Sequence, residues 1–384
     1  MNIGRFILLL AFIIFLIGGM NLYAASRIFQ SIAFLFPKIN RFRFIYAGIY
    51  IFIAFSFIVG KWPSRLPPVI KGIFSWTGAH WTGLLIYLCL FFIMADIIVL
   101  IGNALKLTPA HMLLHVRFYA RMAAIALSMA VAAYGLYNAS RIIVVSYDVQ
   151  LKKSLSGEMN IVLVSDLHLG DVNSESSLER ITRGINSLNP DIVCIVGDIF
   201  NDDFYTIRNP DRASALLKSI NAPYGVYASL GNHDGGLTLN EMMDFLERSG
   251  VKILKDEHTI IDERLVLIGR LDPSPIGGFG EMSRRDFSEL LAQIDSNLPL
   301  VVMDHNPASI DQYGAEVDLI LAGHTHGGQL FPGNLFTRSM FTVDYGHYQK
   351  DPGSPHVIVT QGAGTLMMPM RIGTNNEIAS VRVR

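Results

Sequence analysis

Residues 319–330, LILAGHTHGGQL, end a short apolar run with two histidines that are one residue apart. Alternate side chains of an extended segment point to the same side, so the imidazoles of His324 and His326 face one way, with Cα atoms about 6 to 7 Å apart. The glycines around the pair carry no Cβ, which lets backbone and ligand approach closely. Two imidazoles placed in this way could bind two neighbouring metal ions, although surface histidines in a loop give the same pattern.

Four other apolar runs in the second half of the chain end in the same kinds of side chain. All five runs are NIVLVSDLH (160–168), DIVCIVGD (191–198), GVYASLGNHD (225–234), LPLVVMDH (298–305) and DLILAGHTH (318–326). Polar segments with helical periodicity separate them, which is typical of layered α/β packing. A single Asp after a strand is usually a cap or turn residue. Because ligands of open α/β sheets bind at the carboxyl ends of the strands, we predict that the five ends converge on one site.

Helices are predicted between and after these strands. Residues 174–188, SESSLERITRGINSL, have an amphipathic pattern, and residues 240–248, 284–294 and 307–313 are further helix candidates. The Pro and Gly content of residues 272–281 indicates a loop.

The potential ligands at the strand ends are carboxylates and imidazoles without thiolates, which suits divalent manganese, iron or zinc. There are too many of them for one ion. A second ion at about 3.5 to 4 Å from the first would use the surplus, and one aspartate would bridge the pair. Asp198 is the expected bridge, because Gly197 lets the ions approach its backbone and no second carboxylate shares that strand end.

The composition of the whole chain does not fit a single soluble domain. Of its 384 residues, 51% are hydrophobic and only 16% are charged. The formal net charge of −1 argues against a general affinity for nucleic acid, which normally requires a basic face. Cys89 and Cys194 lie in apolar stretches and indicate neither a disulfide framework nor a zinc site.

Hydrophobic residues are concentrated in the first part of the chain. Four segments are each about long enough to cross a bilayer, which takes roughly 20 apolar residues. They are residues 3–25, 42–60, 82–105 and 118–139. The first segment could instead be a cleaved signal peptide, but three further spans follow it.

These segments divide the chain into parts. We predict a four-helix transmembrane region over residues 1–140, a linker over 141–157 and a second domain over 158–384. The protein is therefore expected in the cell membrane as a multi-pass protein, with its N-terminus and second domain on the same side. Flanking Lys and Arg residues are balanced between the two sides, so the positive-inside rule leaves the orientation open.

Asp96 lies deep within the third predicted span. An ionisable group at that depth is a functional candidate, because its desolvation is costly. The alternative is a neutral acid or a structural pairing with Asn103 or Arg121 of a neighbouring helix. Asp96 is not part of the predicted site.

The strand ends resemble the ordered motif set of the calcineurin-like metallophosphoesterases. The matching residues are Asp166-x-His168, Gly197-Asp198, Gly231-Asn232-His233-Asp234, His305 and Gly323-His324-x-His326. The longer strings SDLHLG, DHNP and GHTHGGQLFP are similar to a bacterial branch that often carries a membrane segment ahead of the catalytic domain. The resemblance makes residues 158–384 the catalytic domain. It implies a four-layer α/β fold, in which two packed β-sheets are flanked by helices, preceded here by the four transmembrane helices.

The resemblance also implies two metal sites. One ion would be held by Asp166, His168, Asp198 and His326, and the other by Asp198, Asn232, His305 and His324.

The same resemblance assigns catalytic roles to the two residues that follow Asn232. His233 would contact the phosphoryl oxygens and the leaving group, and Asp234 would fix the orientation of His233. Where relatives commonly have a Trp and a Pro-Pro pair near the end of the chain, this sequence has Leu366, Met367 and Met368. That departure puts only substrate contacts in doubt.

The implied activity is hydrolysis of a phosphoester or pyrophosphate bond by water that two divalent ions activate, with His233 donating a proton to the leaving oxygen. A catalytic domain joined closely to membrane spans favours a phosphorylated substrate that is lipid-linked, and membrane lipids are expected partners. The alternatives are a soluble nucleotide or another phosphodiester, with the spans as an anchor only, and a membrane signalling or binding protein without turnover. The filled ligand positions weigh against the last of these.

Overall fold

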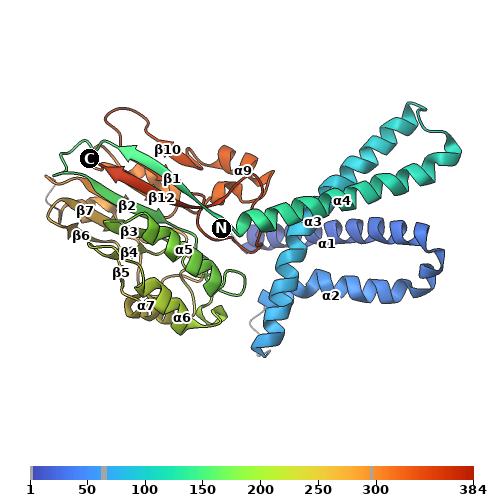
Figure 1. The fold of residues 1–384 in the computed structure, drawn as a ribbon, viewed down its shortest axis with the longest axis horizontal. Coiled ribbons are helices and arrows are strands. Elements are labelled where there is room, and N and C mark those ends of the chain that lie inside the picture. Colours follow the sequence, from blue (N-terminus) through green and yellow to red (C-terminus); the bar gives the residue numbers. More distant parts are fainter. Residues whose placement is uncertain (1–2, 62–66, 295–296) are drawn as a thin grey trace. The chain divides into compact units, whose positions relative to one another are not determined.

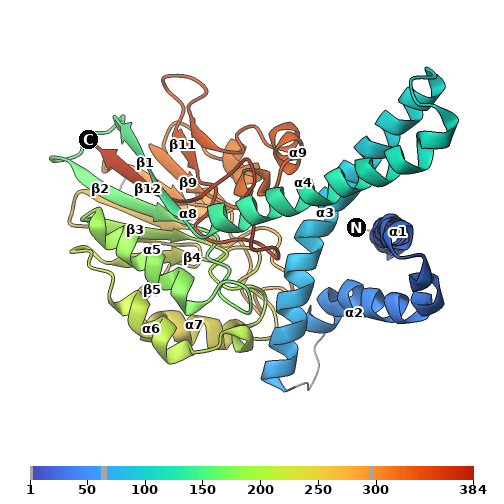
Figure 2. The ribbon, with the colours of Figure 1, turned by 45° about the vertical axis from the view of Figure 1, so that its right-hand side comes forward.

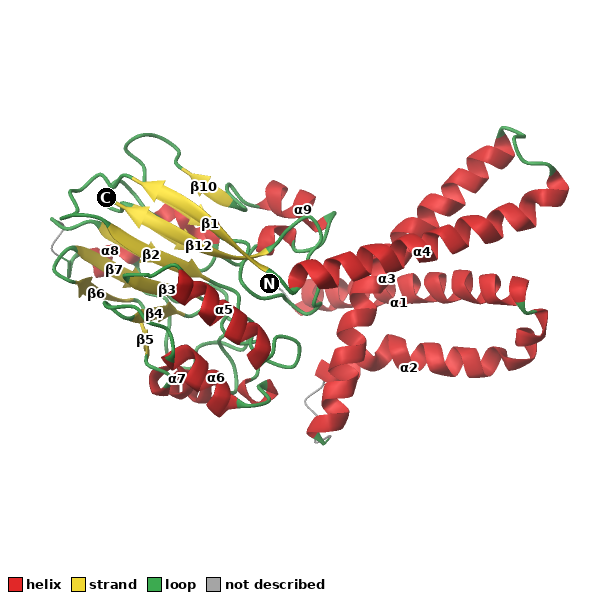
Figure 3. Cartoon of the chain, in the orientation of Figure 1, coloured by secondary structure: helices red, strands yellow, loops and turns green. Residues whose placement is uncertain are grey.

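The computed structural model describes residues 3–61, 67–294 and 297–384. It divides into two compact units, Met1–Gly135 and Leu136–Arg384. The first unit is helical, and the second contains the β-sheets (Figures 1 and 3). The helices of the first unit are α1 (Ile3–Leu35), η1 (Pro37–Phe42), α2 (Arg43–Lys61), α3 (Pro68–Ala104), η2 (Ala110–Met112) and α4 (Leu113–Ala139), of which the last turn belongs to the second unit.

Three helical stretches are long and apolar enough to cross a membrane: Pro37–Gly60, Val69–Ala104 and Ala110–Ala139. They contain the second and fourth predicted spans and all but the last residue of the third, and they indicate membrane association. The first predicted span, 3–25, falls in α1, and several of the side chains early in α1 lie outside the described residues. The helix α3 begins at Pro68 rather than near residue 82, because proline fits the first turn of a helix, where its missing N–H is not needed.

Asp96 in α3 is paired within the first unit. Its Oδ2 accepts a hydrogen bond from the hydroxyl of Tyr23 at 2.7 Å and lies 2.7 Å from Nη2 of Arg27. Both partners belong to α1. Asp96 therefore has a structural ion pair, as the second of the two sequence-based alternatives proposes, but the partner is Arg27 rather than Asn103 or Arg121.

The second unit contains two six-stranded sheets. In spatial order, the first sheet consists of β1 (Ile142–Val149), β12 (Asn376–Val383), β2 (Met159–Val164), β3 (Ile192–Val196), β4 (Val226–Ser229) and β5 (Val251–Ile253). The second consists of β10 (Gly346–Tyr348), β11 (His356–Val359), β9 (Leu319–Ala322), β8 (Leu300–Met303), β7 (Leu265–Gly269) and β6 (Glu257–Ile261). Both sheets are mixed, because β12 is antiparallel to β2, β6 to β7 and β10 to β11, whereas the central strands run parallel.

Short helices connect these strands. They are α5 (Glu175–Ser187), η3 (Phe204–Thr206), α6 (Pro210–Lys218), α7 (Leu239–Arg248), α8 (Phe287–Leu291), η4 (Pro307–Gln312), η5 (His326–Gly328) and α9 (Gly333–Met340). Figure 2 shows α5, α6 and α7 along one face of the first sheet.

The second unit has four layers, and the strand β2 shows why. Its side chains alternate: Val162 and Val164 pack against α5, α6 and α7, whereas Ile161 and Leu163 pack against the second sheet. A third apolar cluster lies between the other face of the second sheet and α8. The prediction of two packed sheets flanked by helices is confirmed.

The predicted strands that carry candidate ligands are present as β2, β3, β4, β8 and β9. The predicted helices over 174–188 and 240–248 correspond to α5 and α7. The candidate over 284–294 is shorter in the structure, where it forms α8, and the candidate over 307–313 is the 3-10 helix η4. Because these five strands are parallel within their sheets, their carboxyl ends lie at a common edge.

The stretch 141–157, predicted as a linker, differs in the structure. It contains β1, an edge strand that pairs with β12 over its whole length. Directly before it, the α4 residue Asn138 donates hydrogen bonds from Nδ2 to the carbonyl oxygens of Thr374 and Arg371, at 2.7 and 3.2 Å. The last turn of α4 and the residues that follow it therefore belong to the second unit.

Candidate metal centre

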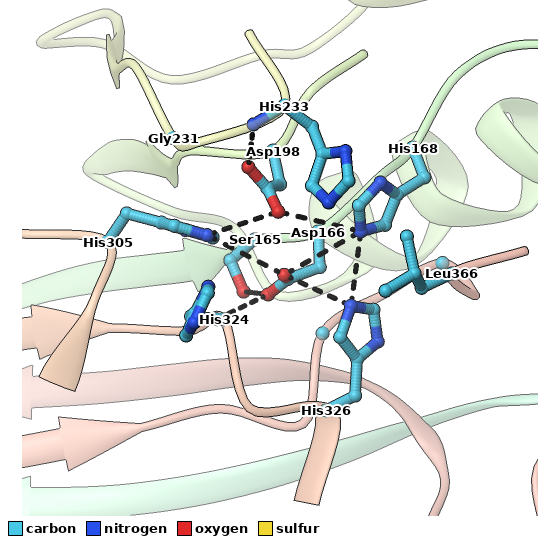
Figure 4. Close-up of polar contacts among 12 residues, drawn as sticks. Ser165, Asp166, His168, Asp198, Gly231, His233, His305, His324, His326 and Leu366 are labelled. Atoms are coloured by element: carbon cyan, nitrogen blue, oxygen red, sulfur yellow. Dashed lines mark hydrogen bonds and ion pairs between the residues drawn. The ribbon is translucent and has the colours of Figure 1, made fainter. Parts of the chain in front are cut away.

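The carboxyl ends of the five parallel strands bring the candidate ligands together (Figure 4). Two groups of side chains each offer three ligand atoms that lie within 4.8 Å of one another. One group is Asp166, His168 and His326, and the other is Asp198, His305 and His324. All are buried except His324, which is half-buried. The segments that carry them are distant in the sequence and meet only in the folded sheets.

Asp198 lies between the two groups. Its Oδ2 is 3.2 Å from Nε2 of His305 in its own group and 3.7 Å from Nε2 of His168 in the other. Its Oδ1 accepts a hydrogen bond from the backbone N–H of His233 at 2.9 Å, which fixes the plane of the carboxylate. This position between the groups is the one required of a bridging ligand.

In the other group, the Nε2 atoms of His168 and His326 are 3.1 Å apart. The Oδ1 of Asp166 lies 3.2 Å from Nε2 of His326, and its Oδ2 accepts a hydrogen bond from the hydroxyl of Ser165. Two imidazole nitrogens and a carboxylate oxygen thus point at one small volume.

Glycine is needed where these segments approach each other. Gly197 has a φ of 70°, and a Cβ there would lie 2.6 Å from the ring of His305 and 2.8 Å from the Cα of Gly231. A side chain at Gly197 would therefore separate the ends of three strands. The missing side chain of Gly197 lets His305 and Gly231 lie close to β3. The sequence suggests a different role, in which Gly197 gives metal ions access to the backbone.

The backbone of the centre is in an uncommon conformation. Five non-glycine residues have φ between 45° and 70°: Asp166, His168, Asp198, His324 and His326. The segment around the H-x-H pair is therefore not extended, and the two imidazoles enter different groups because the chain turns between them. Left-handed conformations of non-glycine residues cost on the order of 1 to 3 kcal/mol each and concentrate at functional sites.

Several buried polar atoms of the centre have no hydrogen-bond partner among the described residues. They include Oδ1 of Asn232, whereas Oδ1 of Asp166 and Nε2 of His305 face only other candidate ligands. Leaving such atoms unpaired costs about 1 to 3 kcal/mol each. Divalent ions satisfy oxygen and neutral imidazole donors of this kind, so the donor set fits metal binding.

Burial keeps two of the histidines in the form that binds metal. It lowers the pKa of His168 to about 3 and that of His324 to about 4, so both imidazoles are neutral near pH 7. His305 differs, because burial is outweighed by the charge of Asp198 and the pKa of His305 is raised well above its ordinary value. Its Nδ1 lies 2.8 Å from the carbonyl oxygen of Val196 and donates to it, which directs Nε2 toward Asp198.

His233 is oriented by a different residue from the one that the resemblance implies. Its Nδ1 lies 2.6 Å from Oδ1 of Asp202. Asp234 instead accepts hydrogen bonds from the backbone N–H groups of Phe200 and Gly231, at 2.9 and 2.8 Å. Burial raises the pKa of Asp234 to about 7. Asp234 thus holds the β3 and β4 loops together, and the contact with Nδ1 of His233 is made by Asp202.

Asp202 is the residue that reading the sequence missed. It follows Asp198 by four positions in GDIFNDD and is next to Asp203, which caps η3 by accepting from the N–H of Tyr205. The available signal was an acidic pair beside a strand end. Nothing in the sequence distinguishes which of the two aspartates faces the site.

The carboxylate that precedes His305 lies outside the centre. Asp304 accepts hydrogen bonds from Arg284 and from the hydroxyl of Tyr313, and so it supports the loop after β8. Asn232 follows Gly231, which packs against Asp198, and the Oδ1 of Asn232 accepts no hydrogen bond from the described residues.

Comparisons with known proteins agree with this geometry. The family model of calcineurin-like phosphoesterases matches residues 159–328. An uncharacterized metallophosphoesterase of Aquifex aeolicus is 33% identical over 240 residues, which cover 62% of this chain and 90% of that protein. A Danio rerio transmembrane protein with a metallophosphoesterase domain is 30% identical over 277 residues, which cover 67% of this chain and 61% of that protein.

These relatives are bacterial and eukaryotic, so the similarity extends beyond a bacterial branch. Among solved structures, a dimetal phosphatase from Danio rerio aligns with a TM-score of 0.32 and 15% identity, over 52% of this chain and 86% of its own. With two clusters of metal-binding side chains at its strand ends, the chain belongs to the calcineurin-like metallophosphoesterase family and is a metal-dependent phosphoester hydrolase.

Proposed function

We propose that the protein is a membrane-anchored phosphohydrolase with two metal ions, which cleaves a phosphoester or pyrophosphate bond in a lipid-linked substrate. The observation that carries the proposal is the pair of ligand groups with Asp198 between them. In this assignment one ion is held by Asp166, His168, Asp198 and His326, and the other by Asp198, Asn232, His305 and His324. Divalent manganese, iron and zinc all suit these donors.

When bound, the two ions supply positive charge that activates water and stabilises the transferring phosphoryl group. The chain contributes a proton at the leaving oxygen through His233. Because Nδ1 of His233 is bonded to Asp202, its Nε2 remains to deliver the proton. The burial of His233 opposes its charged form, but the hydrogen bond with Asp202 and the charge of Asp198 raise its pKa, which favours the protonated acid.

Asp202 is a positioning residue in this mechanism. We expect Asp202→Asn to lower kcat by roughly ten- to a hundredfold, the usual effect of removing a partner that orients an active-site group. KM and metal content should stay close to wild type, because Asp202 is in neither ligand group.

Steady-state kinetics and elemental analysis of the purified variant measure both quantities. Asp202→Glu should restore part of kcat, and the neighbouring Asp203→Asn serves as the control with the same change of charge. An unchanged kcat in Asp202→Asn, or an equal loss in Asp203→Asn, would contradict the role.

The lipid-linked substrate is supported by the short connection between membrane and catalytic fold. Only Ser140 and Arg141 separate the end of α4 from the start of β1. At about 3.3 Å per residue they span less than 10 Å, so the catalytic unit is confined near a membrane that α4 crosses. This proposal includes the first predicted span, 3–25, as a fourth transmembrane helix within residues 1–140, and a catalytic domain that extends the predicted 158–384 to include β1.

A second support is an exposed apolar surface beside the metal centre. Four side chains in and before α9 are 46, 56, 66 and 75% exposed: Phe331, Leu335, Phe336 and Met340. The following Phe341 lies edge to face with His324, at 6.0 Å between ring centroids. An apolar patch next to a phosphoesterase centre is suited to the chain of a lipid.

Replacing part of this patch should affect lipid substrates selectively. We expect Phe336→Ser with Met340→Ser to lower kcat/KM for a diacylglycerol pyrophosphate in phosphatidylcholine vesicles by about tenfold or more, because each buried side chain contributes about 1.5 to 3 kcal/mol. Hydrolysis of bis(p-nitrophenyl) phosphate, a soluble diester, should be unchanged. Ile260→Ser is the matched control, because Ile260 is 56% exposed on the edge strand β6. Equal losses on both substrates would show that the spans act as an anchor only.

The direct test of the whole proposal uses the purified full chain. Elemental analysis should find two divalent ions per chain, and a panel of monoesters, diesters and pyrophosphates with added manganese should show phosphate release. Metal binding without turnover on any of them would favour a binding protein. Accessibility of a C-terminal tag in intact cells determines on which side of the membrane catalysis occurs.

A further inference from the structure

A pocket in the first unit, separate from the metal centre, is lined by positive charge. It has a volume of about 380 Å³ and lies between the second half of α1, η1 and the first turns of α4. Its polar lining includes Gln30, Asn40, Arg117 and Arg121, and its apolar lining includes Phe34 and Phe118. The two aromatic rings are stacked at 4.5 Å between centroids, which makes one wall of the pocket continuous and apolar.

The charge of the first unit is strongly unbalanced. Among residues 1–135, Asp96 is the only acidic residue. The basic residues of the same range are Arg5, Arg27, Lys38, Arg41, Arg43, Lys61, Arg65, Lys71, Lys106, Arg117 and Arg121. The single carboxylate is already engaged by Arg27 and Tyr23, both at 2.7 Å. No second carboxylate of this unit is therefore available to balance the guanidinium groups of the pocket.

The polar groups of the pocket are held in place. The Nδ2 of Asn40 donates to the carbonyl oxygen of Pro37 at 3.1 Å, and the Nε2 of Gln30 donates to the hydroxyl of Ser26 at 2.9 Å. The Nε of Arg121 is buried and has no hydrogen-bond partner among the described residues. The polar side chains of the pocket are therefore fixed, and the guanidinium of Arg121 has an N–H group that can donate a hydrogen bond to a ligand.

The position of the pocket matches the surface of a bilayer. It lies where α1 turns through η1 into α2 and where α4 begins, which are the ends of apolar helices. Headgroup phosphates lie at this level, and basic pockets between membrane helices bind them. Arginine is suited to this role because its planar fork donates two parallel hydrogen bonds to a phosphate.

We propose that this pocket binds the phosphate of an anionic membrane lipid, with Arg117 and Arg121 on the phosphate and an acyl chain along Phe34 and Phe118. The bound lipid supplies the negative charge that the first unit lacks. The inference concerns a lipid that stays bound and is independent of the substrate proposed for the metal centre.

The experiment uses the full chain purified in mild detergent and titrated with dioleoyl phosphatidylglycerol, with bound lipid counted by native mass spectrometry. We expect Arg117→Gln with Arg121→Gln to weaken binding roughly thirtyfold, because each basic residue near an anionic headgroup contributes about 1 kcal/mol, a gain of about fivefold. The lysine double variant, Arg117→Lys with Arg121→Lys, should keep part of the affinity. Dioleoyl phosphatidylcholine and inorganic phosphate should bind weakly to the wild type.

The matched control is Arg41→Gln with Arg43→Gln, which removes the same charge from exposed positions that do not line the pocket. Binding in this control should stay within about threefold of wild type. Equal weakening in both double variants would assign the effect to general charge and overturn the proposal. So would unchanged binding in the pocket variant, equal affinity for phosphatidylcholine, or equal affinity for inorganic phosphate.

Folding of each variant is checked by hydrolysis of bis(p-nitrophenyl) phosphate and by its elution as a single species. If the double variant does not fold, the single variant Arg117→Gln tests the site. Arg117 is exposed, so its replacement should leave the fold intact. That single change should weaken phosphatidylglycerol binding about fivefold, and wild-type binding would refute the site.

Discussion

Asp198→Asn is expected to lower kcat by at least about a thousandfold, because a bound metal centre contributes several kcal/mol to transition-state stabilisation. Oδ2 of Asp198 lies 3.2 Å from His305 of its own group and 3.7 Å from His168 of the other, whereas Oδ1 of Asp166 reaches the other group only at 4.0 Å, at His305. The asparagine keeps the shape of the side chain but loses the negative charge that a bridging ligand shares between two cations. We therefore expect the loss of at least one bound ion together with the loss of turnover.

Elemental analysis and phosphate release, measured on the same preparation, check this prediction. Asp304→Asn is a demanding comparison, because Asp304 is also buried at a strand end, that of β8, but accepts hydrogen bonds from Arg284 and Tyr313. That variant should lose stability while its folded fraction keeps both ions. A variant Asp198→Asn that retains two ions and wild-type turnover would refute the assignment of the centre.

His233→Gln is the second large expected effect, with kcat reduced by roughly a hundred- to ten-thousandfold, the range for loss of a general acid. The glutamine cannot supply a proton to the leaving oxygen. Both metal ions should remain, because His233 is in neither group of ligand atoms and contributes only its backbone N–H to Asp198.

The leaving group separates the role of an acid from a role in binding. A p-nitrophenyl ester releases a weakly basic oxygen that needs little protonation, whereas an alkyl ester releases a strongly basic one. The loss in His233→Gln should therefore be at least about tenfold larger for the alkyl ester. Equal losses on the two esters would assign His233 to substrate binding instead.

The ligand groups of the metal centre could be predicted from the sequence because the signal is local and repeated. Each of five apolar runs is followed within a few residues by Asp, Asn or His, and parallel strands bring such ends to one edge. The spacing of His324 and His326 predicts that both imidazoles enter the site, and the structure places one in each group of candidate ligands. It also predicts an extended segment, whereas both residues have positive φ.

Three other features could not be predicted from the sequence: the strand β1, the contact of Asp202 and the pairing of Asp96. Each depends on contacts between distant segments, and the hydrophobic periodicity of a segment carries no information about such contacts. The strand β1 pairs with β12 near the other end of the chain, and nothing in the sequence of residues 141–157 shows this pairing. Asp202 and Asp234 have the same chemistry and lie in neighbouring loops, and only the fold shows that Asp202 contacts Nδ1 of His233. The pairing of Asp96 with Arg27 likewise depends on which faces of α1 and α3 meet.

The contacts of the last turn of α4 limit where the chain can be shortened. Asn138 is bonded to the carbonyl oxygens of Arg371 and Thr374, and β1 starts three residues after α4 ends. A soluble fragment that started at residue 158 would strip β12 of its parallel neighbour and leave a bare sheet edge, which invites aggregation. A fragment that keeps both β1 and the hydrogen bonds of Asn138 would have to begin within the last turns of α4.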